Sequence, residues 1–408
     1  MSSILILGAG CEQIPLIDKA KSLDLEVIAA DGSLNAPGFC LADYSYSFNL
    51  GDTDKCISIA KKHNISGVLT LASEYVVPTI AAVAENLNLR GITVATAVSC
   101  TDKVVMRRRF SDACVPSPCS FPITSVDQAA ESLKRLSEFS EYAIVKPALS
   151  SASRGVNRIP VSADIPMLGK CLEIARYHSR NNQVLLEEYV AGEEYSLECL
   201  TFRQQTHVLA ITKKITTGAP NYIETGHIQP ALLSDGLAYI LRETAISGIR
   251  ALGIDDTASH VEIRLSNQEP KIIEIAARMA GGSIASHLVR LSTGIDYLGA
   301  AIKTALGEIP NIKVRFDKGA AIRFFTPQPG TIASIRGIDD AKQMPGVVLL
   351  SFSVNAGDKV GELKDGTSRI GRIICQADTA KEALFLADRA ASQISIGYVA
   401  PKNGIISK

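Results

Sequence analysis

Two glutamates in the stretch 260–282 have the residue type and spacing of a metal site. The stretch reads HVEIRLSNQEPKIIEIAARMAGG, in which two strand-like runs flank a short polar turn. A hairpin centred on that turn puts Glu262 opposite Glu274. The same register puts Ile263 opposite Ile273, on a face that would be buried. Like charges directly opposite each other destabilise a sheet, so the pair needs a reason. A cation such as Mg2+, which binds one or two carboxylates together with substrate phosphates, would supply one.

The residues around the two glutamates add to this chemistry. Strand alternation places His260 and Arg264 on the same face. Arg278 is a bidentate hydrogen-bond donor for a phosphate or a carboxylate. Gly281 and Gly282 allow another group to approach the backbone closely. The alternative is a hairpin face whose charges point into water, and the hairpin by itself does not decide between the two.

A second stretch has the composition of a phosphate site. The apolar run at 143–145 delivers Lys146 to a loop of small residues, PALSSASRG. Small side chains let backbone amides approach phosphate oxygens, and a lysine supplies a point charge. The loop is not a Walker A motif, because GxxxxGK[ST] is absent. The alternative is a surface loop after an edge strand.

A third stretch, 185–198, reads LLEEYVAGEEYSLE and runs from one strand through a glycine turn into another. Adenine is recognised by a backbone donor and acceptor between apolar walls, and ribose hydroxyls by a carboxylate acceptor. This segment offers all of these groups. The alternative is a hairpin with exposed glutamates.

Composition narrows the classes of protein that fit. The chain has 408 residues, of which 46% are hydrophobic and 21% charged, so it can bury large cores. Its formal net charge is zero and it has no Trp, which gives no support for a nucleic-acid or membrane partner. The nine cysteines are scattered without a CxxC pair, as expected for reduced thiols. With no signal peptide or membrane-spanning run evident, we expect a cytoplasmic protein.

The elements that position these residues begin with an alternation of strands and helices. Short apolar strands at 4–7, 27–30 and 67–71 predict a parallel α/β sheet. The start of a helix is expected at 101–103, with Thr or Asp as its cap.

The glycine turn after the first strand raises the alternative of an NAD-dependent oxidoreductase. Gly8 and Gly10 are followed by Asp31, but Gln13 occupies the position of the third fingerprint glycine. A lone GxG is weak evidence, so a tight strand-to-helix turn is favoured.

Together these motifs resemble those of the ATP-grasp superfamily over most of the chain. Lys103, the loop after Lys146, the 185–198 stretch and the 260–282 hairpin occur in the family's order and spacing. The resemblance implies a mixed α/β and α+β fold, in which a Rossmann-like parallel-sheet domain precedes two α+β subdomains that hold ATP. The expected segments are the N-terminal domain at 1–95, a linker helix at 96–119, the lid at 120–195, the core at 196–312 and a C-terminal α+β subdomain at 313–408.

The resemblance also assigns the nucleotide site, with ATP and Mg2+, or alternatively Mn2+, as the implied cofactors. The phosphates are assigned to Lys103, Lys146, Ser151, Ser153, Arg154 and Gly155. Adenine is assigned to Glu187, Glu188 and Val190, the first and third mainly through their backbone. Ribose is assigned to Glu194, and the metal to Glu262 and Glu274. Arg278 would steady the transferred phosphate or the acyl-phosphate, so Glu274 and Arg278 are the catalytic candidates here.

The segment IETGHIQP, which contains Glu224 and His227, resembles a segment of the L-amino-acid ligases, which join two amino acids. Glu224 would recognise an α-amino group, and His227 would orient the substrate or handle a proton. A structural histidine at a turn is the alternative. Gly281 and Gly282 would leave room for a bulky first substrate. Arg323 would bind a carboxylate or a phosphate, with a core salt bridge as the alternative.

The implied reaction joins a carboxylate to an amine through an acyl-phosphate and releases ADP and phosphate. We expect small-molecule substrates, amino acids above all, and a homodimer. Two departures from the family pattern are Ala276, where asparagine is common, and Ala152, where glycine is common. The alternatives are a purine-pathway or carbamoyl-phosphate-like enzyme with the same ATP residues and, because of Ala276, an ATP-binding sensor.

Overall fold

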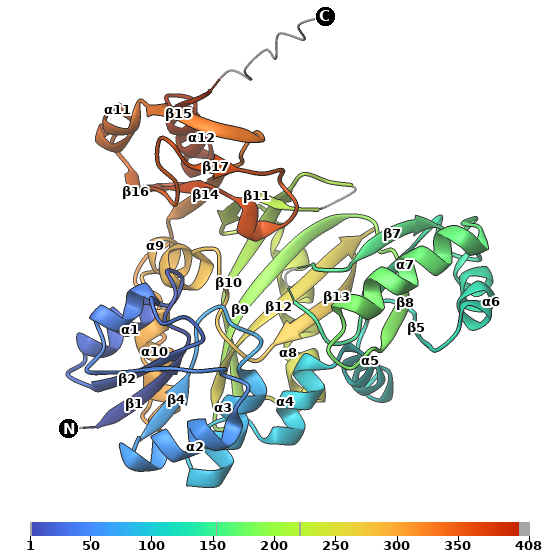
Figure 1. Ribbon diagram of the computed structural model, residues 1–408, viewed down its shortest axis with the longest axis horizontal. Coiled ribbons are helices and arrows are strands. Elements are labelled where there is room, and N and C mark those ends of the chain that lie inside the picture. Colours follow the sequence, from blue (N-terminus) through green and yellow to red (C-terminus); the bar gives the residue numbers. More distant parts are fainter. Residues whose placement is uncertain (1, 152, 220–221, 400–408) are drawn as a thin grey trace, which may run out of the picture. The chain divides into compact units, whose positions relative to one another are not determined.

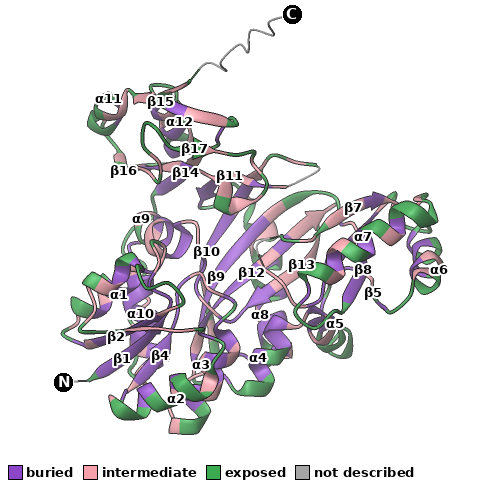
Figure 2. Ribbon diagram, viewed as in Figure 1, coloured by how far each residue is buried: buried purple, intermediate pink, exposed green. Residues whose placement is uncertain are grey.

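The computed structural model describes residues 2–151, 153–219 and 222–399, so Ala152 lies outside the described residues. The chain forms two compact units. The first consists of Met1–Lys213 and Ala231–Asp317, and the second of Lys214–Pro230 and Lys318–Lys408. Figure 1 labels the elements of each unit, and Figure 2 shows that buried residues gather in the strands and on the inner faces of the helices, whereas the outer faces of the helices are exposed.

A parallel four-stranded sheet begins the first unit, as the alternation of strands and helices predicted. The strand order is β3-β2-β1-β4, and every residue of β1 is buried. The strands are β1 (Ser3–Leu7), β2 (Glu26–Asp31), β3 (Tyr44–Ser47) and β4 (Gly67–Leu69). The helices are α1 (Ile14–Lys21), η1 (Pro37–Cys40), α2 (Thr53–Lys62) and α3 (Val77–Leu87).

The glycine turn after β1 is filled by a side chain from the chain itself. Gln13 donates from Nε2 to the carbonyl of Leu71, and a Cβ added at Gly8 would lie 3.2 Å from the Gln13 side chain. Asp31 accepts a hydrogen bond from the Ala9 amide at 2.7 Å. The residue that replaces the third fingerprint glycine thus occupies the space beside the turn, which favours a plain strand-to-helix turn over a dinucleotide site.

One residue, Asp102, separates the next two helices. Its Oδ1 accepts a hydrogen bond from the Val104 amide at 2.9 Å, and its Oδ2 accepts one from the Asn181 side chain at 3.2 Å. The cap fixes Lys103 as the first residue of the second helix. The expected helix start is therefore confirmed, with Asp102 as the capping residue. The two helices are α4 (Val94–Thr101) and α5 (Lys103–Asp112).

An antiparallel sheet with two helices carries the small-residue loop. The strand order is β5-β8-β6-β7, and helices α6 and α7 cover a core that includes Leu133, Val145 and Leu172. The strands are β5 (Ser120–Ile123), β6 (Tyr142–Pro147), β7 (Asn157–Pro160) and β8 (Val184–Glu188). The helices are α6 (Val126–Leu136) and α7 (Ile165–His178).

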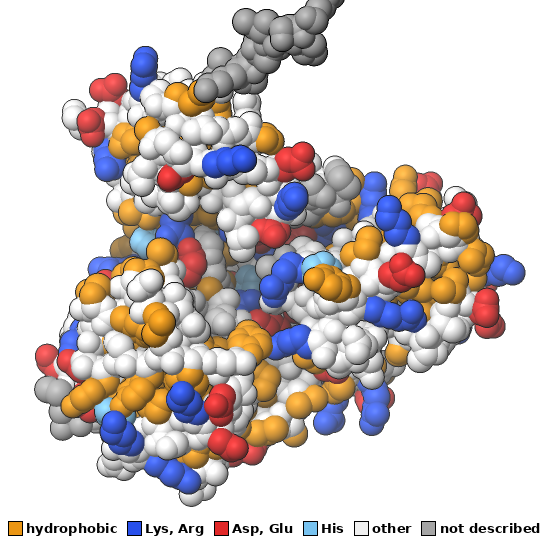
Figure 3. All heavy atoms as spheres, in the orientation of Figure 1, with side chains coloured by type: hydrophobic (Ala, Val, Ile, Leu, Met, Phe, Trp, Pro, Cys, Tyr) orange, Lys and Arg blue, Asp and Glu red, His pale blue; other side chains and the backbone are white. Residues whose placement is uncertain are grey.

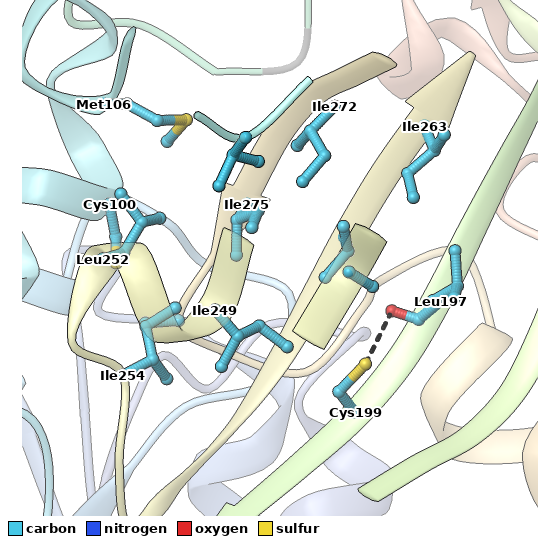
Figure 4. Close-up of a cluster of buried hydrophobic side chains, with 14 of the residues drawn as sticks. Cys100, Met106, Leu197, Cys199, Ile249, Leu252, Ile254, Ile263, Ile272 and Ile275 are labelled. Carbon is cyan, nitrogen blue, oxygen red and sulfur yellow. Dashed lines mark hydrogen bonds between the residues drawn. The ribbon is translucent and has the colours of Figure 1, made fainter. Parts of the chain in front are cut away.

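The predicted hairpin lies in a larger sheet, in which β13, β12, β9 and β10 are neighbours in that order. Helices α4, α5 and α8 pack on one face of it, where Met106, Ile249 and Ile275 meet in a hydrophobic core (Figure 4). The strands are β9 (Glu193–Phe202), β10 (Gln205–Thr216), β12 (Thr257–Ser266) and β13 (Glu269–Ala276). The helices are α8 (Asp235–Leu252), the π-helix η2 (Ile284–Leu288), α9 (Val289–Thr293) and α10 (Tyr297–Ala305).

The register of the hairpin is partly as predicted. Glu262 lies opposite Glu274, but a bulge follows and Ile263 lies opposite Ile272. The expected pairing of Ile263 with Ile273 is therefore wrong. Ile272 is fully buried, whereas Ile273 is only half-buried, because the extra residue in β13 shifts the alternation by one position.

The second unit contains β11, β14, β18 and β16 as neighbours in that order, with α12 packed on β14 and β18. A small antiparallel sheet has the order β17-β15-β19. The strands are β11 (Glu224–Gln229), β14 (Gly319–Phe325), β15 (Gly330–Arg336), β16 (Val347–Phe352), β17 (Lys359–Val360), β18 (Gly371–Ala377) and β19 (Ser395–Tyr398). The helices are α11 (Ile338–Gln343), η3 (Gly366–Ser368) and α12 (Ala380–Ala391).

Two properties of the chain bear on its partners. Acidic and basic side chains are interspersed over the face seen in Figure 3, in keeping with the formal net charge of zero. Among the described residues, no helix combines the length and the apolar character needed to span a membrane.

Candidate active site

The two hairpin glutamates face each other, and each accepts from a cationic side chain of the protein. Oε1 of Glu274 accepts a hydrogen bond from the Lys103 ammonium at 2.8 Å. Oε1 of Glu262 lies 3.2 Å from Nε2 of His260. Burial alone would lower the pKa of His260, but Glu198 and Glu262 outweigh it and raise that pKa to about 9. The imidazole is therefore charged at neutral pH and donates to the carboxylate of Glu262.

Lys103 joins the hairpin to the small-residue loop. Its ammonium donates to the carbonyl of Ser150 at 2.9 Å, and its backbone amide donates to the carbonyl of Ala148 at 3.0 Å. Burial alone would lower the pKa of Lys103, but Glu274 and Glu74 outweigh it and raise that pKa. A single buried cation thus connects α5, the loop and one of the candidate metal ligands.

Lys146 lies in a buried charge network with a residue that the motifs did not reveal. Its ammonium is 2.6 Å from Oε2 of Glu187, and Arg107 donates from Nε to Oε1 of the same carboxylate at 2.9 Å. Burial, aided by Arg107 and Lys103, lowers the pKa of Lys146 to about 8 despite the attraction of Glu187. The Glu187 side chain therefore faces Lys146, the candidate phosphate ligand, which agrees with the predicted backbone role of Glu187 at adenine.

The predicted adenine and ribose residues are held together by one arginine. Arg264 donates from Nη1 to the carbonyl of Val190 at 3.0 Å and from Nη2 to Oε2 of Glu194 at 3.1 Å. Glu188 is paired with Lys271 at 2.5 Å. The segment is consequently fixed to β12 and β13 and is not a hairpin whose glutamates are free in solvent.

Among the phosphate-loop candidates, Ser153 and Arg154 are exposed, whereas Ser151 and Gly155 are half-buried. Arg154 donates from Nε to the carbonyl of Ser151 at 3.1 Å and from Nη2 to its hydroxyl at 3.2 Å. Ser153 and Gly155 have left-handed φ values of +56° and +76°. A Cβ at Gly155 would lie 2.8 Å from Cβ of His178, so glycine is required at that position.

Arg278 pairs with a buried carboxylate that the sequence analysis did not single out. Its Nη2 lies 3.4 Å from Oε2 of Glu74, while Oε1 of Glu74 is buried without a hydrogen-bond partner among the described residues. Burial raises the pKa of Glu74 to about 7, and Glu274 and Glu262 add to the shift although Arg278 and Lys103 oppose it. Glu74 thus belongs electrostatically to the same site as the two hairpin glutamates.

The space beside Gly281 is already filled, which corrects the expectation of room for a bulky substrate. A Cβ added at Gly281 would lie 2.9 Å from Cβ of Ala72, and the Ala72 amide donates to the carbonyl of Met279 at 3.2 Å. The Gly282 amide donates to Oε2 of Glu12 at 3.0 Å. Close packing between two loops, and not an open pocket, therefore accounts for the missing side chain at Gly281.

In the second unit, Glu224 is neutralised by the chain's own cations. It lies 3.1 Å from the Lys214 ammonium and 3.4 Å from Nη1 of Arg369. His227 is fully buried on strand β11, not at a turn, with Nε2 3.5 Å from Glu224 and its ring edge-on to Phe324. Burial would raise the pKa of Glu224, but Lys214 and His227 hold that pKa well below its usual range.

Arg323 does not join the Glu224 and His227 cluster. Arg323 lies opposite Gly226 in the β11/β14 register, whereas His227 lies opposite Ile322, so the two side chains point to opposite faces of the sheet. Arg323 instead donates from Nη2 to Asp388 of α12 at 3.0 Å. The assignment to substrate is therefore corrected to the ion-pair alternative, which lies at the surface and not in the core.

The hairpin suits Mg2+ without forming a complete protein cage. Among the described residues, no group of three or more His, Cys, Asp or Glu side chains has the arrangement of a metal site. Two opposed carboxylates nevertheless match the way Mg2+ is bound in nucleotide sites, where phosphates and water supply the remaining ligands. Glu262 and Glu274 would hold the ion.

Sequence signals exist for the two residues that the motifs missed. Arg107 follows Lys103 by four residues on α5, so both side chains lie on one face of the helix. Glu74 follows the carboxyl end of the parallel strand β4, which is the edge where α/β sheets bind ligands.

Two family models match the chain. The ATP-grasp domain matches residues 139–287, and the L-amino acid ligase C-terminal domain 2 matches residues 323–399. The first range contains the Lys146 loop and the hairpin, and the second contains Arg369.

Two relatives illustrate the likeness in sequence. An uncharacterised protein of Sinorhizobium fredii is 28% identical over 338 residues, which cover 82% of this chain and 69% of that protein. The alanine–anticapsin ligase of Bacillus subtilis is 26% identical over 263 residues, which cover 60% of this chain and 54% of the ligase. The match thus spans about half the length of that ligase.

Two solved structures illustrate the likeness in fold. The L-amino acid ligase of Bacillus licheniformis has a TM-score of 0.83 at 22% identity, over 98% of this chain and 99% of that one. The phosphoribosylglycinamide synthetase of Anaerococcus prevotii has a TM-score of 0.79 at 21% identity, over 98% and 100% of the two chains. The fold predicted from the sequence is confirmed.

Proposed function

The chain belongs to the ATP-grasp ligases, and we propose that it joins the carboxylate of one amino acid to the amino group of another at the expense of ATP. The network around Lys103 carries this proposal. It connects the phosphate loop to Glu274, beside the pair formed by Arg278 and Glu74. The match to the L-amino acid ligase C-terminal domain supports an amino acid as substrate.

The proposed reaction has two steps. An oxygen of the first substrate's carboxylate attacks the γ-phosphorus of ATP, the bond to ADP breaks and an acyl-phosphate forms. The amine nitrogen of the second substrate then attacks the acyl carbon. The carbon–oxygen bond to phosphate breaks, and the nitrogen loses a proton to solvent. This chemistry depends mainly on positioning and charge neutralisation.

The residues of the first unit have matching roles in this scheme. Lys103 and Lys146 offset the charge of the transferred phosphate, and the guanidinium of Arg278 holds a phosphate or carboxylate oxygen. Bound at Glu262 and Glu274, Mg2+ or Mn2+ would neutralise charge on the phosphates.

Glu74 suits the α-amino group of the first substrate better than Glu224 does. Its Oε1 is buried and has no hydrogen-bond partner in the described part of the chain, and Arg278 lies beside it for the carboxylate of the same amino acid. An incoming ammonium would satisfy this oxygen and favour the charged carboxylate. Glu224 has two cationic partners in the chain, so an added ammonium would gain less there.

The cluster in the second unit suits an anion. Lys214 and Arg369 bring two positive charges to the carboxylate of Glu224, and both would attract an incoming anion. The carboxylate of an amino-acid substrate is the anion we propose for it.

The proposal is tested by an ADP-release screen over pairs of amino acids, with product masses measured. We expect ADP only in the presence of substrate, together with a product that has the mass of two amino acids less one water. ATP hydrolysis that no amino acid alters would contradict it. We further propose a cytoplasmic homodimer, which light scattering on the purified protein checks for its subunit number.

A purine-type reaction is the second candidate, favoured by one relative. A formate-dependent phosphoribosylglycinamide formyltransferase of Maridesulfovibrio salexigens is 23% identical over 411 residues, covering 97% of this chain and 96% of that enzyme. Lys214 and Arg369 beside Glu224 would then receive a substrate phosphate. ADP release with a phosphorylated amine and formate, and none with amino-acid pairs, would decide for this reaction.

A further inference from the structure

We infer that His260, anchored by Glu198, is a positioning residue for the carboxylate of Glu262. The inference rests on the proposed function, because it concerns the metal ion that accompanies ATP. Glu262 and Glu274 are the candidate metal ligands, and His260 is not one of them.

The imidazole of His260 bridges two carboxylates. Its Nδ1 lies 2.6 Å from Oε1 of Glu198, and its Nε2 lies 3.2 Å from Oε1 of Glu262. His260 and Glu262 are two residues apart on β12 and therefore point to the same face, and Glu198 lies directly opposite His260 on β9. Three neighbouring positions of the sheet thus form one hydrogen-bonded row that ends at a candidate metal ligand.

The first residue of this row, Glu198, carries a charge at a position where burial is energetically costly. Glu198 is fully buried, and its Oε2 has no hydrogen-bond partner among the residues that the structure describes. Burying a carboxylate costs several kcal/mol unless a partner compensates, and an apolar pair of the same size would fill this position with less loss. A role for Glu198 in orienting the ring of His260 toward Glu262 explains why a charged residue occupies this position.

On the opposite strand, the residue that faces His260 cannot take part in positioning Glu262. On β13 the residue facing His260 is Ala276, whose methyl group makes no hydrogen bond. The imidazole restricts the side-chain rotamers of Glu262, so less conformational freedom is lost when the carboxylate takes up a metal ion. Hydrogen-bond partners of metal ligands commonly change metal affinity by about 10- to 100-fold when they are removed.

The test compares metal-dependent and metal-free nucleotide binding. ADP binding is measured by calorimetry at increasing Mg2+ and again in EDTA, for the native protein, His260→Gln and the double variant Glu198→Gln/His260→Gln. The double variant removes the unpaired buried charge that the single change leaves, so it guards against loss of the fold. Mn2+ binding in the presence of ADP, followed by electron paramagnetic resonance, gives a second readout.

We expect the Mg2+ concentration at half-saturation to rise about tenfold in both variants, with ADP affinity in EDTA unchanged. His207→Gln, at an exposed histidine on the neighbouring β10, is the matched control and should behave as the native protein. A folded double variant with the native Mg2+ midpoint would overturn this inference and leave the proposed function intact. A native protein that binds no ADP at any Mg2+ concentration would overturn both.

Discussion

The ammonium of Lys103 lies 2.8 Å from Oε1 of Glu274, although the two residues are 171 positions apart in the chain. Both side chains are largely withdrawn from water, with 8% and 21% of their surfaces exposed. The start of helix α5 is therefore bonded to the second strand of the hairpin. A candidate phosphate ligand and a candidate metal ligand are each other's partner, so a change to either one alters the environment of both.

Replacing Glu274 with Gln should stop the reaction without unfolding the chain. The amide keeps a hydrogen-bond acceptor for Lys103 but loses the charge that would hold the metal ion. We expect turnover, measured as ADP release, to fall by at least about 100-fold. Glu269→Gln, at an exposed position of the same strand, is the control and should retain full turnover. Native turnover in Glu274→Gln would remove this residue from the site.

Glu74 should make the protein less stable as the pH rises. The pKa of Glu74 is raised from its ordinary value of 4.5 to about 7, because burial and then Glu274 disfavour its charge. The folded chain binds this proton more tightly than the unfolded chain does, so stability falls as pH rises between these two values.

Glu74→Gln should consequently be more stable than the native protein at pH 8, by about 1–3 kcal/mol, and similar to it at pH 4.5. Urea unfolding at both pH values measures the difference. An equal effect of the substitution at the two pH values would show that the carboxyl group does not titrate in this way.

Removing Arg107 should destabilise the fold strongly. Its guanidinium and the ammonium of Lys146 share the buried carboxylate of Glu187, so Arg107→Leu leaves that carboxylate undercompensated. We expect the free energy of unfolding to drop by about 3 kcal/mol. Arg108→Leu, at the next position, removes a side chain that is 84% exposed and should change stability by less than about 0.5 kcal/mol. Similar losses in both variants would argue against the buried network.

The contact between Gly281 and Ala72 should appear as a coupling between two substitutions. Gly281→Ala places a methyl group 2.9 Å from Cβ of Ala72, and we expect a loss of about 1–3 kcal/mol in urea unfolding. Adding Ala72→Gly removes the opposing methyl group and also suits the left-handed φ of +66° at that position.

The double variant should therefore recover most of the lost stability. Gly236→Ala, where no heavy atom lies within 4 Å of the added Cβ, serves as the control and should lose none. Additive effects of the two substitutions would mean that Gly281 and Ala72 are not in tight contact.

Local sequence patterns predicted those features of the fold that depend on residues close together in the chain. Strand alternation and the central turn were sufficient to place Glu262 opposite Glu274. The bulge that follows was not predictable in this way, because it depends on how β13 packs against the helices. Its effect is visible in Ile273, which was predicted to be buried and is only half-buried, and in its neighbour Ile272, which is fully buried.

The motifs could not predict contacts between segments that are far apart in the chain. Arg107 lies 80 positions from Glu187, and Glu74 lies 204 positions from Arg278. The partners of Glu224 are likewise spread along the chain, with Arg369 145 positions away. A motif identifies a residue type that suits a given chemistry. Only the folded chain shows whether the charge of that residue is already neutralised by another residue of the protein.

The single residue between α4 and α5 makes chain length at this point as important as residue type. Asp102 ends one helix and caps the next, and Lys103 follows it at once. A residue inserted directly after Asp102 would either separate the capping carboxylate from α5 or turn Lys103 by about 100° around the helix axis, away from Glu274. Insertions and deletions should therefore be absent from this junction in related chains, even where the surrounding side chains vary.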